Sequence, residues 1–335
     1  MGIRRNITLN AAARDDYVRG VLALKAELTG ISTADLGFGV APGASHQQLS
    51  TWDLFVIWHV WAMQTMTPAA SSNNPRGRNA AHRGPAFLPW HRWLMILLEW
   101  QFQRVLGNNN FGLPYWNWAT DGSRPVSQQP SRPIWRNNAM GGNGSISSGF
   151  VATGPFRGSQ FRVLVETDSA GDLQATNRPL RRRFGSTRPA LEGGPFGLPT
   201  RQNVTPALNE TNYDEADWDI GSGEFRNRLE GWTPSHPQSM LHNRVHVWIG
   251  GDMGPSTSPN DPAFYLNHCN VDRIWAAWQA KNPARPYLPT SSAPSFLFRH
   301  RRSDALHSAL TSIAPTPAQL LNVANLYTYD NLVVN

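Results

Sequence analysis

The chain has 335 residues, of which 40% are hydrophobic and 10% aromatic, so it contains enough apolar material to form a substantial core. This composition excludes a wholly disordered protein, and the length allows one large domain or two. The formal net charge is +7, and only two of the 30 basic residues are lysines, Lys25 and Lys281. Because the arginines are scattered and no nucleic-acid-binding motif accompanies them, we expect no nucleic-acid partner.

The single cysteine, Cys269, excludes an intramolecular disulfide and a cysteine-rich zinc or iron–sulfur site. Any metal must therefore be bound by histidines or carboxylates. The longest apolar stretch, residues 54–63, contains a histidine and is far shorter than the ~20 residues that a membrane-spanning helix needs. Polar residues also occupy the place of a signal peptide's apolar core, so we expect no membrane span and no signal peptide. The compartment stays open between the cytoplasm and export with a partner protein.

Apolar residues recur with helical spacing in several segments of the chain. In chain order, the pattern predicts helices over 14–29, 50–66, 91–106, 239–248 and 267–280. Residues 91–106 are apolar on almost every side, which is typical of a helix at the centre of a protein. Asp53 lies near the start of the second helix, where an acidic residue favours helix formation. The fold class predicted from these segments is mainly α.

Between residues 120 and 205 the composition shifts to Gly, Pro, Ser and Arg, with short β-like runs such as 161–166 at most. This composition predicts a long irregular insertion, and long irregular segments inside compact domains are often functional. Histidine-bearing segments lie on both sides of the insertion. Because a shared site needs both halves, we expect residues 1–335 to form a single domain.

Six of the ten histidines fall into two groups of three: His59, His82 and His91, then His242, His246 and His268. The first two histidines of the second group are spaced i,i+4 on a predicted helix, so both imidazoles project from one face. No Glu stands between them, which disfavours the HExxH motif of zinc proteases. Two prolines prevent a continuous helix between the last two histidines of the first group, so a loop there can bring both to one point. The other four are expected at the surface: His46, His236, His300 and His307.

The segments around these histidines resemble the signatures of the type 3 copper proteins, the superfamily of tyrosinases, catechol oxidases and hemocyanins. HRGPAFLPWHR at 82–92 is similar to the first copper signature, with His59 as its third ligand. LHNRVHVWIGGDM at 241–253 and SPNDPAFYLNHCNVDRIW at 258–275 are similar to the second. The chain is most similar to bacterial, actinomycete-like tyrosinases, with further matches in PYWNWATD at 114–121, FRNRLEGW at 225–232 and YTYD at 327–330.

The resemblance implies a central four-helix bundle that carries a dinuclear copper site. Its six ligands would be His59, His82, His91, His242, His246 and His268. Three neutral imidazoles per metal suit copper, which stands at the top of the divalent stability order. Two coppers together can reduce O2 by two electrons, so O2 is the expected co-substrate. The implied activity is oxidation of small phenolic substrates, phenols and o-diphenols, to o-quinones, and a copper-delivery helper protein is an expected partner.

The resemblance also suggests roles for residues that surround the ligands. Phe87 and Phe264 each stand four residues before a ligand histidine and are expected to pack on imidazole rings, with plain core packing as the alternative. Asp272, one turn after a ligand, is expected to accept a hydrogen bond from a ligand N–H and so select its tautomer. A salt bridge to an arginine is the alternative for this carboxylate.

The C-terminal Tyr327 and Tyr329 resemble a Tyr-x-Tyr motif that closes the domain against an N-terminal arginine, here Arg4 or Arg5, by a cation–π contact. Two positions depart from the family pattern without removing a ligand. Asn267 stands where the family often has a first histidine of a pair. Ala80 stands where fungal members have a cross-linked cysteine.

Hydroxylation of a monophenol needs a general base, because a phenol of pKa about 10 must lose its proton before it can bind copper. The resemblance suggests that Glu230 and Asn243 fix a water that accepts this proton. The segment TPSHPQSM lengthens the spacing between Glu230 and His242, and a surface or salt-bridged carboxylate is the alternative for Glu230. Val247, directly after a ligand, and Met253, in the next Gly-rich turn, are expected to shape the substrate entrance, with ordinary helix packing as the alternative for Val247.

Two other functions stay open. One is an o-aminophenol or catechol oxidase without monophenol hydroxylation, since small changes near the second site separate these activities. The other is a hemocyanin-like O2 carrier, in which the same coppers bind O2 reversibly.

Overall fold

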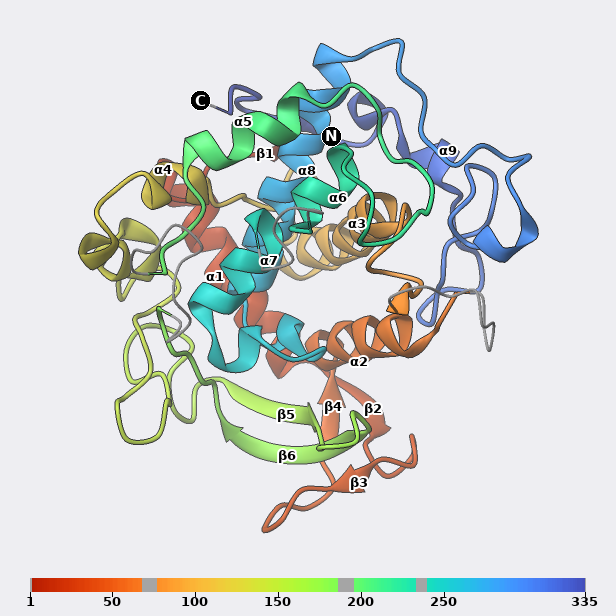
Figure 1. Ribbon diagram of the computed structural model, residues 1–335. Coiled ribbons are helices and arrows are strands. Elements are labelled where there is room, and N and C mark those ends of the chain that lie inside the picture. The colour runs from red at the N-terminus through yellow and green to blue at the C-terminus, as the bar shows by residue number, and fades with distance from the viewer. Residues whose placement is uncertain (1, 68–76, 186–195, 233–239, 335) are drawn as a thin grey trace.

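The computed structural model describes residues 2–67, 77–185, 196–232 and 240–334, and it is mainly helical, as predicted (Figure 1). Its α-helices are α1 (Ala11–Ala26), α2 (Thr51–Gln64), α3 (Phe87–Leu106), α4 (Trp118–Gly122), α5 (Arg201–Asn209), α6 (Phe225–Glu230), α7 (Leu241–Ile249), α8 (Ala263–Lys281) and α9 (Pro317–Leu320). Its strands are β1 (Ile3–Arg4), β2 (Leu28–Ser32), β3 (Gly39–Val40), β4 (Gln48–Ser50), β5 (Arg162–Thr167), β6 (Leu173–Pro179) and β7 (Thr328–Tyr329).

The central bundle consists of α2, α3, α7 and α8, with α8 packed against both α3 and α7 (Figure 1). Helix α2 begins with a capping box, in which the Ser50 hydroxyl accepts from the Asp53 N–H and the Asp53 carboxylate accepts from the Ser50 N–H. Helix α3 is buried along most of its length, which fits its apolar sequence. The sequence therefore predicted the elements that carry the histidines.

Both α3 and α8 begin four residues earlier than predicted, at Phe87 and Ala263. The expectation of a loop up to the ligand histidine is wrong because a proline is tolerated in the first turn of a helix, where its missing N–H has no partner to lose. Pro89 lies in that turn of α3, and Pro262 precedes α8. Phe87 and Phe264 consequently lie on the same helix as the ligand histidine, one turn before it.

The segment 120–205 is more regular than predicted. Strands β5 and β6 form an antiparallel hairpin, with Val165 opposite Ala175, and β3 joins β6 in parallel. Only β5 has an apolar pattern strong enough to be noticed in the sequence, whereas β6 reads LQATNRP. The hairpin lies beyond α2, at the bottom of Figure 1.

Buried hydrophobic residues from both sides of this segment, such as Val56 and Trp275, belong to one core cluster. This supports the single-domain prediction, which stays a prediction.

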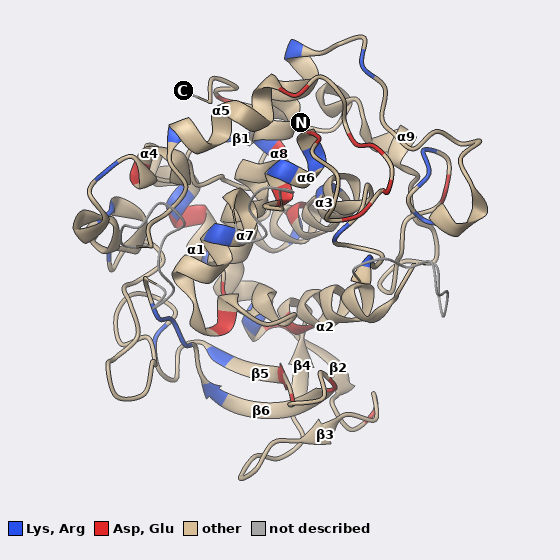
Figure 2. Ribbon diagram, viewed as in Figure 1, with Lys and Arg blue, Asp and Glu red and all other residues tan. Residues whose placement is uncertain are grey.

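None of the helices in the described ranges is long and apolar enough to cross a membrane. Lysines and arginines are distributed over many elements of the ribbon, α6, α7 and the hairpin among them (Figure 2).

The two ends of the chain meet through β1 and β7, which pair in parallel. The Arg4 guanidinium carbon lies 3.4 Å from the centroid of the Tyr327 ring, so the predicted cation–π contact forms, with Arg4 as the cation.

The prediction that His300 lies at the surface is wrong. Its ring is fully buried, with Nδ1 accepting from the Ala86 N–H at 3.1 Å and Nε2 lying 2.6 Å from Thr67 Oγ1.

Candidate metal centre

The two groups of histidines come together in the bundle from different elements. His59 lies on α2, His91 on α3 and His82 in the loop before α3, whereas the second group lies on α7 and α8. Within each group, the three candidate ligand atoms lie within 4.8 Å of one another. The rings of His91 and His268, one from each group, stack with centroids 4.2 Å apart. The structure therefore forms two adjacent histidine triads.

Main-chain carbonyls fix the tautomer of one imidazole on each of α2, α3 and α7. The Nδ1 atoms of His59, His91 and His246 donate to the oxygens of Ser256, Phe87 and Met253 at 2.6, 2.8 and 2.7 Å, respectively. A neutral imidazole that donates through Nδ1 has its lone pair on Nε2. All three Nε2 atoms are buried and lack a hydrogen-bond partner within the described ranges. Buried acceptors of this kind are available to a metal ion.

His242 is oriented in a similar way by its neighbours. Its Nδ1 lies 2.9 Å from Asn243 Oδ1 and 3.2 Å from the main-chain oxygen of Glu230. Its Nε2 faces His268 Nε2 at 3.1 Å. Two imidazole nitrogens facing each other at this distance are suited to share a cation.

Burial keeps these imidazoles neutral. Desolvation lowers the pKa of His59 to about 3 and that of His246 to about 4. The pKa values of the other four ligand candidates, His82, His91, His242 and His268, are also well below the usual value, mainly through burial. Neutral imidazoles are the form that binds metal. Together with the unpartnered Nε2 atoms, this donor set fits two copper ions, each held by three nitrogens.

Phe87 and Phe264 pack between the triads. The Phe264 ring centroid lies 4.1 Å from that of His268 and 5.1 Å from that of His59. The Phe87 centroid lies 4.9 Å from both His91 and His242. Each phenyl ring thus contacts one imidazole from each triad, which limits the rotation of the ligands.

Asp272 does not have the role expected from the sequence. Its carboxylate accepts from Arg92 Nε at 2.6 Å and lies 3.3 Å from Arg4 Nη1, and the Tyr327 and Tyr329 hydroxyls also donate to it. His268 Nδ1 has no hydrogen-bond partner among the described residues. The alternative, a salt bridge to arginine, is the observed arrangement, because two buried guanidinium groups need a buried counter-charge.

Glu230 and Asn243 both lie beside His242. The Glu230 carboxylate is buried and accepts from the Arg83 N–H at 2.7 Å and from Arg226 Nη1 at 2.9 Å. Burial raises its pKa. Asn243 Nδ2 is buried without a hydrogen-bond partner in the described part of the chain. Residues 233–239, which include His236 and most of the TPSHPQSM segment, lie outside the described residues.

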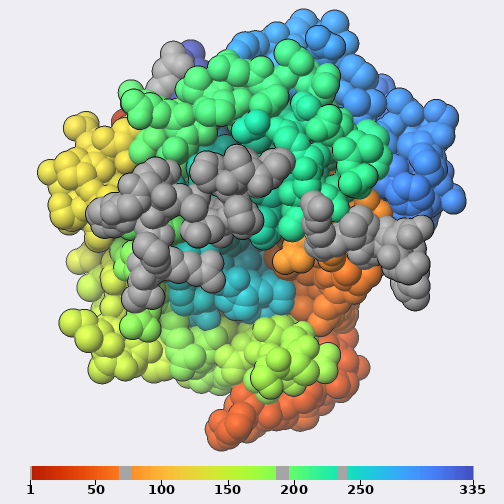
Figure 3. Space-filling view, viewed as in Figure 1, coloured from red at the N-terminus to blue at the C-terminus, as the bar shows by residue number. Residues whose placement is uncertain are grey.

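Val247 is partly exposed and packs at the edge of the core, whereas Met253 is fully buried. The Met253 side chain does not reach the surface, and its carbonyl orients His246; that Met253 shapes the substrate entrance stays a prediction. The segment with α7 and the following turn, cyan in Figure 3, reaches the molecular surface next to the β5–β6 hairpin.

One supporting residue was missed in the sequence. Asn79 Oδ1 accepts from the main-chain N–H groups of Ala81 and His82, at 3.1 and 2.8 Å. This turn holds the only ligand that does not lie on a helix among the six. An asparagine two or three residues before a candidate ligand in a loop is a recognisable signal, since Asn side chains commonly accept from the backbone just after them.

Comparisons with known proteins agree with this geometry. The family described as the common central domain of tyrosinase matches residues 49–281. The chain belongs to the tyrosinase family. A tyrosinase from Streptomyces antibioticus is 38% identical over 76% of this chain and 82% of its own length. A tyrosinase from Streptomyces glaucescens is 32% identical over 98% of this chain and 99% of its own.

Solved structures show the same fold. A polyphenol oxidase from Thermothelomyces thermophila superimposes with a TM-score of 0.71, covering 99% of this chain and 89% of its own at 24% identity. A functional unit of octopus hemocyanin is more distant, with a TM-score of 0.53 and 69% of its own length covered at 21% identity. The family match and the two triads make this tyrosinase-family chain a type 3 copper oxidoreductase of the phenol-oxidising kind.

Proposed function

We propose that the six histidines bind two copper ions and that the enzyme uses O2 to convert both monophenols and o-diphenols to o-quinones. The observation that carries this proposal is the pair of adjacent triads, with their neighbouring rings stacked at 4.2 Å. Three nitrogens per ion leave positions open for O2 and for a substrate oxygen. When bound, the two coppers supply the electrons that reduce O2.

Both reactions balance without a further co-reactant. One monophenol and one O2 give one o-quinone and one water, and two o-diphenols and one O2 give two o-quinones and two waters. The phenolic proton must leave the substrate oxygen. A monophenol depends most on a base for this step, because a diphenol loses its first proton somewhat more easily and offers two oxygens. The protein therefore needs a proton acceptor next to the site.

We assign that acceptor to a water held by Glu230 and Asn243. Asn243 Nδ2 is a buried donor without a partner within the described ranges, so it is available to the water. A carboxylate offers about four lone-pair sites, which leaves Glu230 able to accept from a water besides Arg83 and Arg226. Both residues lie at His242, so the water would stand beside the second triad.

Val247 is proposed to contact the substrate ring. It follows His246 directly, keeps part of its side chain exposed, and is small enough to leave space for a phenol. Because Met253 is buried, Val247 is the better candidate for a residue that selects substrates by size.

Steady-state assays of the copper-loaded enzyme with a monophenol, its catechol and an o-aminophenol test the proposal. Glu230→Gln and Asn243→Ala should lower monophenol turnover at least about tenfold more than catechol turnover, because general-base catalysis contributes factors of about 10² to 10⁴. Glu210→Gln is the matched control, because Glu210 pairs with Arg228 of the same helix as Glu230. Equal losses on both substrates would contradict the role of the water.

A second candidate is an o-aminophenol oxidase without monophenol hydroxylation. It is favoured by the engagement of the Glu230 carboxylate with Arg226 and Arg83, which already occupy part of its accepting capacity. Wild-type enzyme that turns over o-aminophenol and catechol but no monophenol would select this function. A copper-delivery helper protein stays a prediction from the family resemblance.

A further inference from the structure

We infer that Arg226, anchored by Asp214, is a positioning residue that holds the Glu230 carboxylate at the junction of the two triads and thereby supports monophenol turnover. This inference rests on the proposed function, in which Glu230 holds the water that accepts the phenolic proton. Arg226 lies on α6, one turn before Glu230, and neither Arg226 nor Asp214 belongs to a histidine triad.

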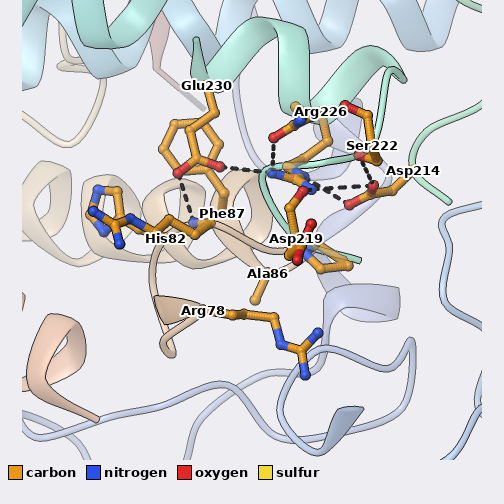
Figure 4. Close-up of polar contacts among 12 residues, drawn as sticks. Arg78, His82, Ala86, Phe87, Asp214, Asp219, Ser222, Arg226 and Glu230 are labelled. Atoms are coloured by element: carbon orange, nitrogen blue, oxygen red, sulfur yellow. Dashed lines mark hydrogen bonds and ion pairs between the residues drawn. The ribbon is translucent and has the colours of Figure 1, made fainter. Parts of the chain in front are cut away.

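Glu230 contacts the segments of both triads. Its side-chain Oε1 accepts from the N–H of Arg83, the residue directly after His82, at 2.7 Å. Its main-chain oxygen lies 3.2 Å from His242 Nδ1. The position of one residue therefore affects a ligand from each triad, and Figure 4 shows its carboxylate between Arg226 and the His82 loop.

The loop that receives this hydrogen bond needs support. Arg83 has φ of 60°, in the left-handed region that residues other than glycine seldom adopt. Such a conformation persists only when its surroundings hold it. The hydrogen bond from the Arg83 N–H to Glu230 is one contact that does so, and it lies directly beside a ligand.

Arg226 in turn holds Glu230 from the opposite side. Its Nη1 donates to Glu230 Oε2 at 2.9 Å, while Nε and Nη2 donate to the two oxygens of Asp214 at 2.7 and 3.2 Å. All three side chains are buried. Asp214 is itself held by the Ser222 hydroxyl and the Glu215 N–H, both at 2.9 Å. Figure 4 shows Asp214, Arg226 and Glu230 in a row that points toward His82.

The geometry requires an arginine. Only the planar, forked guanidinium can donate to both oxygens of Asp214 and still reach Glu230, because a lysine ammonium is a single point charge. In Arg226→Lys the charge is kept but at least one of the two carboxylates loses its fixed partner. Glu230 is then free to change rotamer, and the Arg83 N–H loses its acceptor.

We call the chain of contacts from Asp214 through Arg226 to Glu230 the relay. Two variants test it, Arg226→Lys and Asp214→Asn. The second variant leaves Glu230 and Arg226 chemically intact. Arg182→Lys is the matched control, because Arg182 forms another fully buried two-point pair, with Asp261 at 2.6 and 2.7 Å. The first readout is hydrogen–deuterium exchange of metal-free protein in peptides that contain the Arg83 amide. The second is kcat and KM for a monophenol and its catechol with copper-loaded enzyme.

We expect Arg83 amide exchange to rise about tenfold in both relay variants, since the opening that exposes this amide becomes easier. Monophenol kcat should fall about tenfold relative to catechol kcat, with little change in the ratio of the KM values. The control should change neither readout beyond a general loss of stability. A purely structural role for Arg226 would lower both activities equally.

Unchanged exchange at Arg83 would overturn the relay, whatever the activities are. Faster exchange with an unchanged monophenol-to-catechol ratio would overturn Arg226 as a positioning residue for the reaction. Wild-type enzyme without monophenol activity would instead overturn hydroxylation in the proposed function, and the exchange data alone would then decide the relay.

Discussion

The two triads bind the same kind of ligand but are built differently. In the second triad all three histidines lie on α7 and α8, and two of them are four residues apart on one helix. In the first triad His82 lies in a loop, and its backbone is held by contacts with Asn79 and, through Arg83, with Glu230. Helix geometry therefore positions every member of the second triad, whereas the first triad has one member, His82, whose loop is held by side-chain hydrogen bonds.

Loss of a ligand should have the largest effect and should not distinguish the triads. Replacing any one of the six histidines with Ala should abolish oxidase activity and lower the copper content toward one ion per chain, because two nitrogens hold copper poorly. Metal analysis and a catechol assay measure both. His46→Ala is the control, since His46 is exposed and outside both triads. A His242→Ala protein with two coppers and full turnover would refute the assignment.

Asn79→Ala should affect one triad only. Without the side-chain oxygen, the N–H groups of Ala81 and His82 lose their acceptor, and the loop that carries His82 loosens. Outer contacts of this kind are worth about 10- to 100-fold in metal affinity. Copper titration should therefore show one weakened and one unchanged site. Two equally weakened sites would mean that the loop does not act on the first triad alone.

The difference between the triads also explains what the sequence could reveal. The i,i+4 spacing and the apolar helices are local patterns, so the helices and the histidine pair on one of them were predictable from the residues, whereas the full ligand set and the packing of Phe87 and Phe264 were implied by the family resemblance. The partners of His59 and Asp272 come from distant parts of the chain, at Ser256 for the first and Arg4 for the second. No local pattern encodes such pairings. The tautomer-fixing carbonyls, and the choice between the two roles considered for Asp272, therefore became visible only in the folded chain.

Val247→Phe tests whether the substrate ring lies beside the second triad. A larger side chain beside His246 should reduce the space for a substrate ring, whereas the copper ligands stay in place. We expect KM for bulky phenols to rise by about 10-fold or less, the range that small changes of pocket volume produce, and copper content to stay at the wild-type level. Leu208→Phe, at a partly buried position on α5, is a control for bulk alone. Unchanged kinetics in Val247→Phe would remove this residue from the substrate pocket.

The smallest predicted effect concerns His300, which supports the first triad through Ala86 at the start of α3. Burial, and next the positive charge of Arg78, hold the pKa of His300 well below its usual value. The unfolded chain takes up a proton near the ordinary pKa of about 6.5, while the folded protein does not. The free energy of unfolding should therefore be highest above that pH. It should fall as the pH drops, by at most ~1.4 kcal/mol per pH unit for this group.

His300→Gln removes the group that takes up this proton in the unfolded chain. The loss of stability between about pH 6.5 and 5 should therefore be less steep, since a neutral amide does not titrate. Gln can replace both hydrogen bonds, to the Ala86 N–H and to Thr67 Oγ1, so the variant should cost about 1 kcal/mol at pH 7.5. Urea unfolding of copper-loaded protein at several pH values, with the exposed His46→Gln as control, measures the slope. An identical slope in wild type and His300→Gln would show that this buried ring takes up its proton without unfolding, and that its contact with Ala86 does not depend on a neutral imidazole.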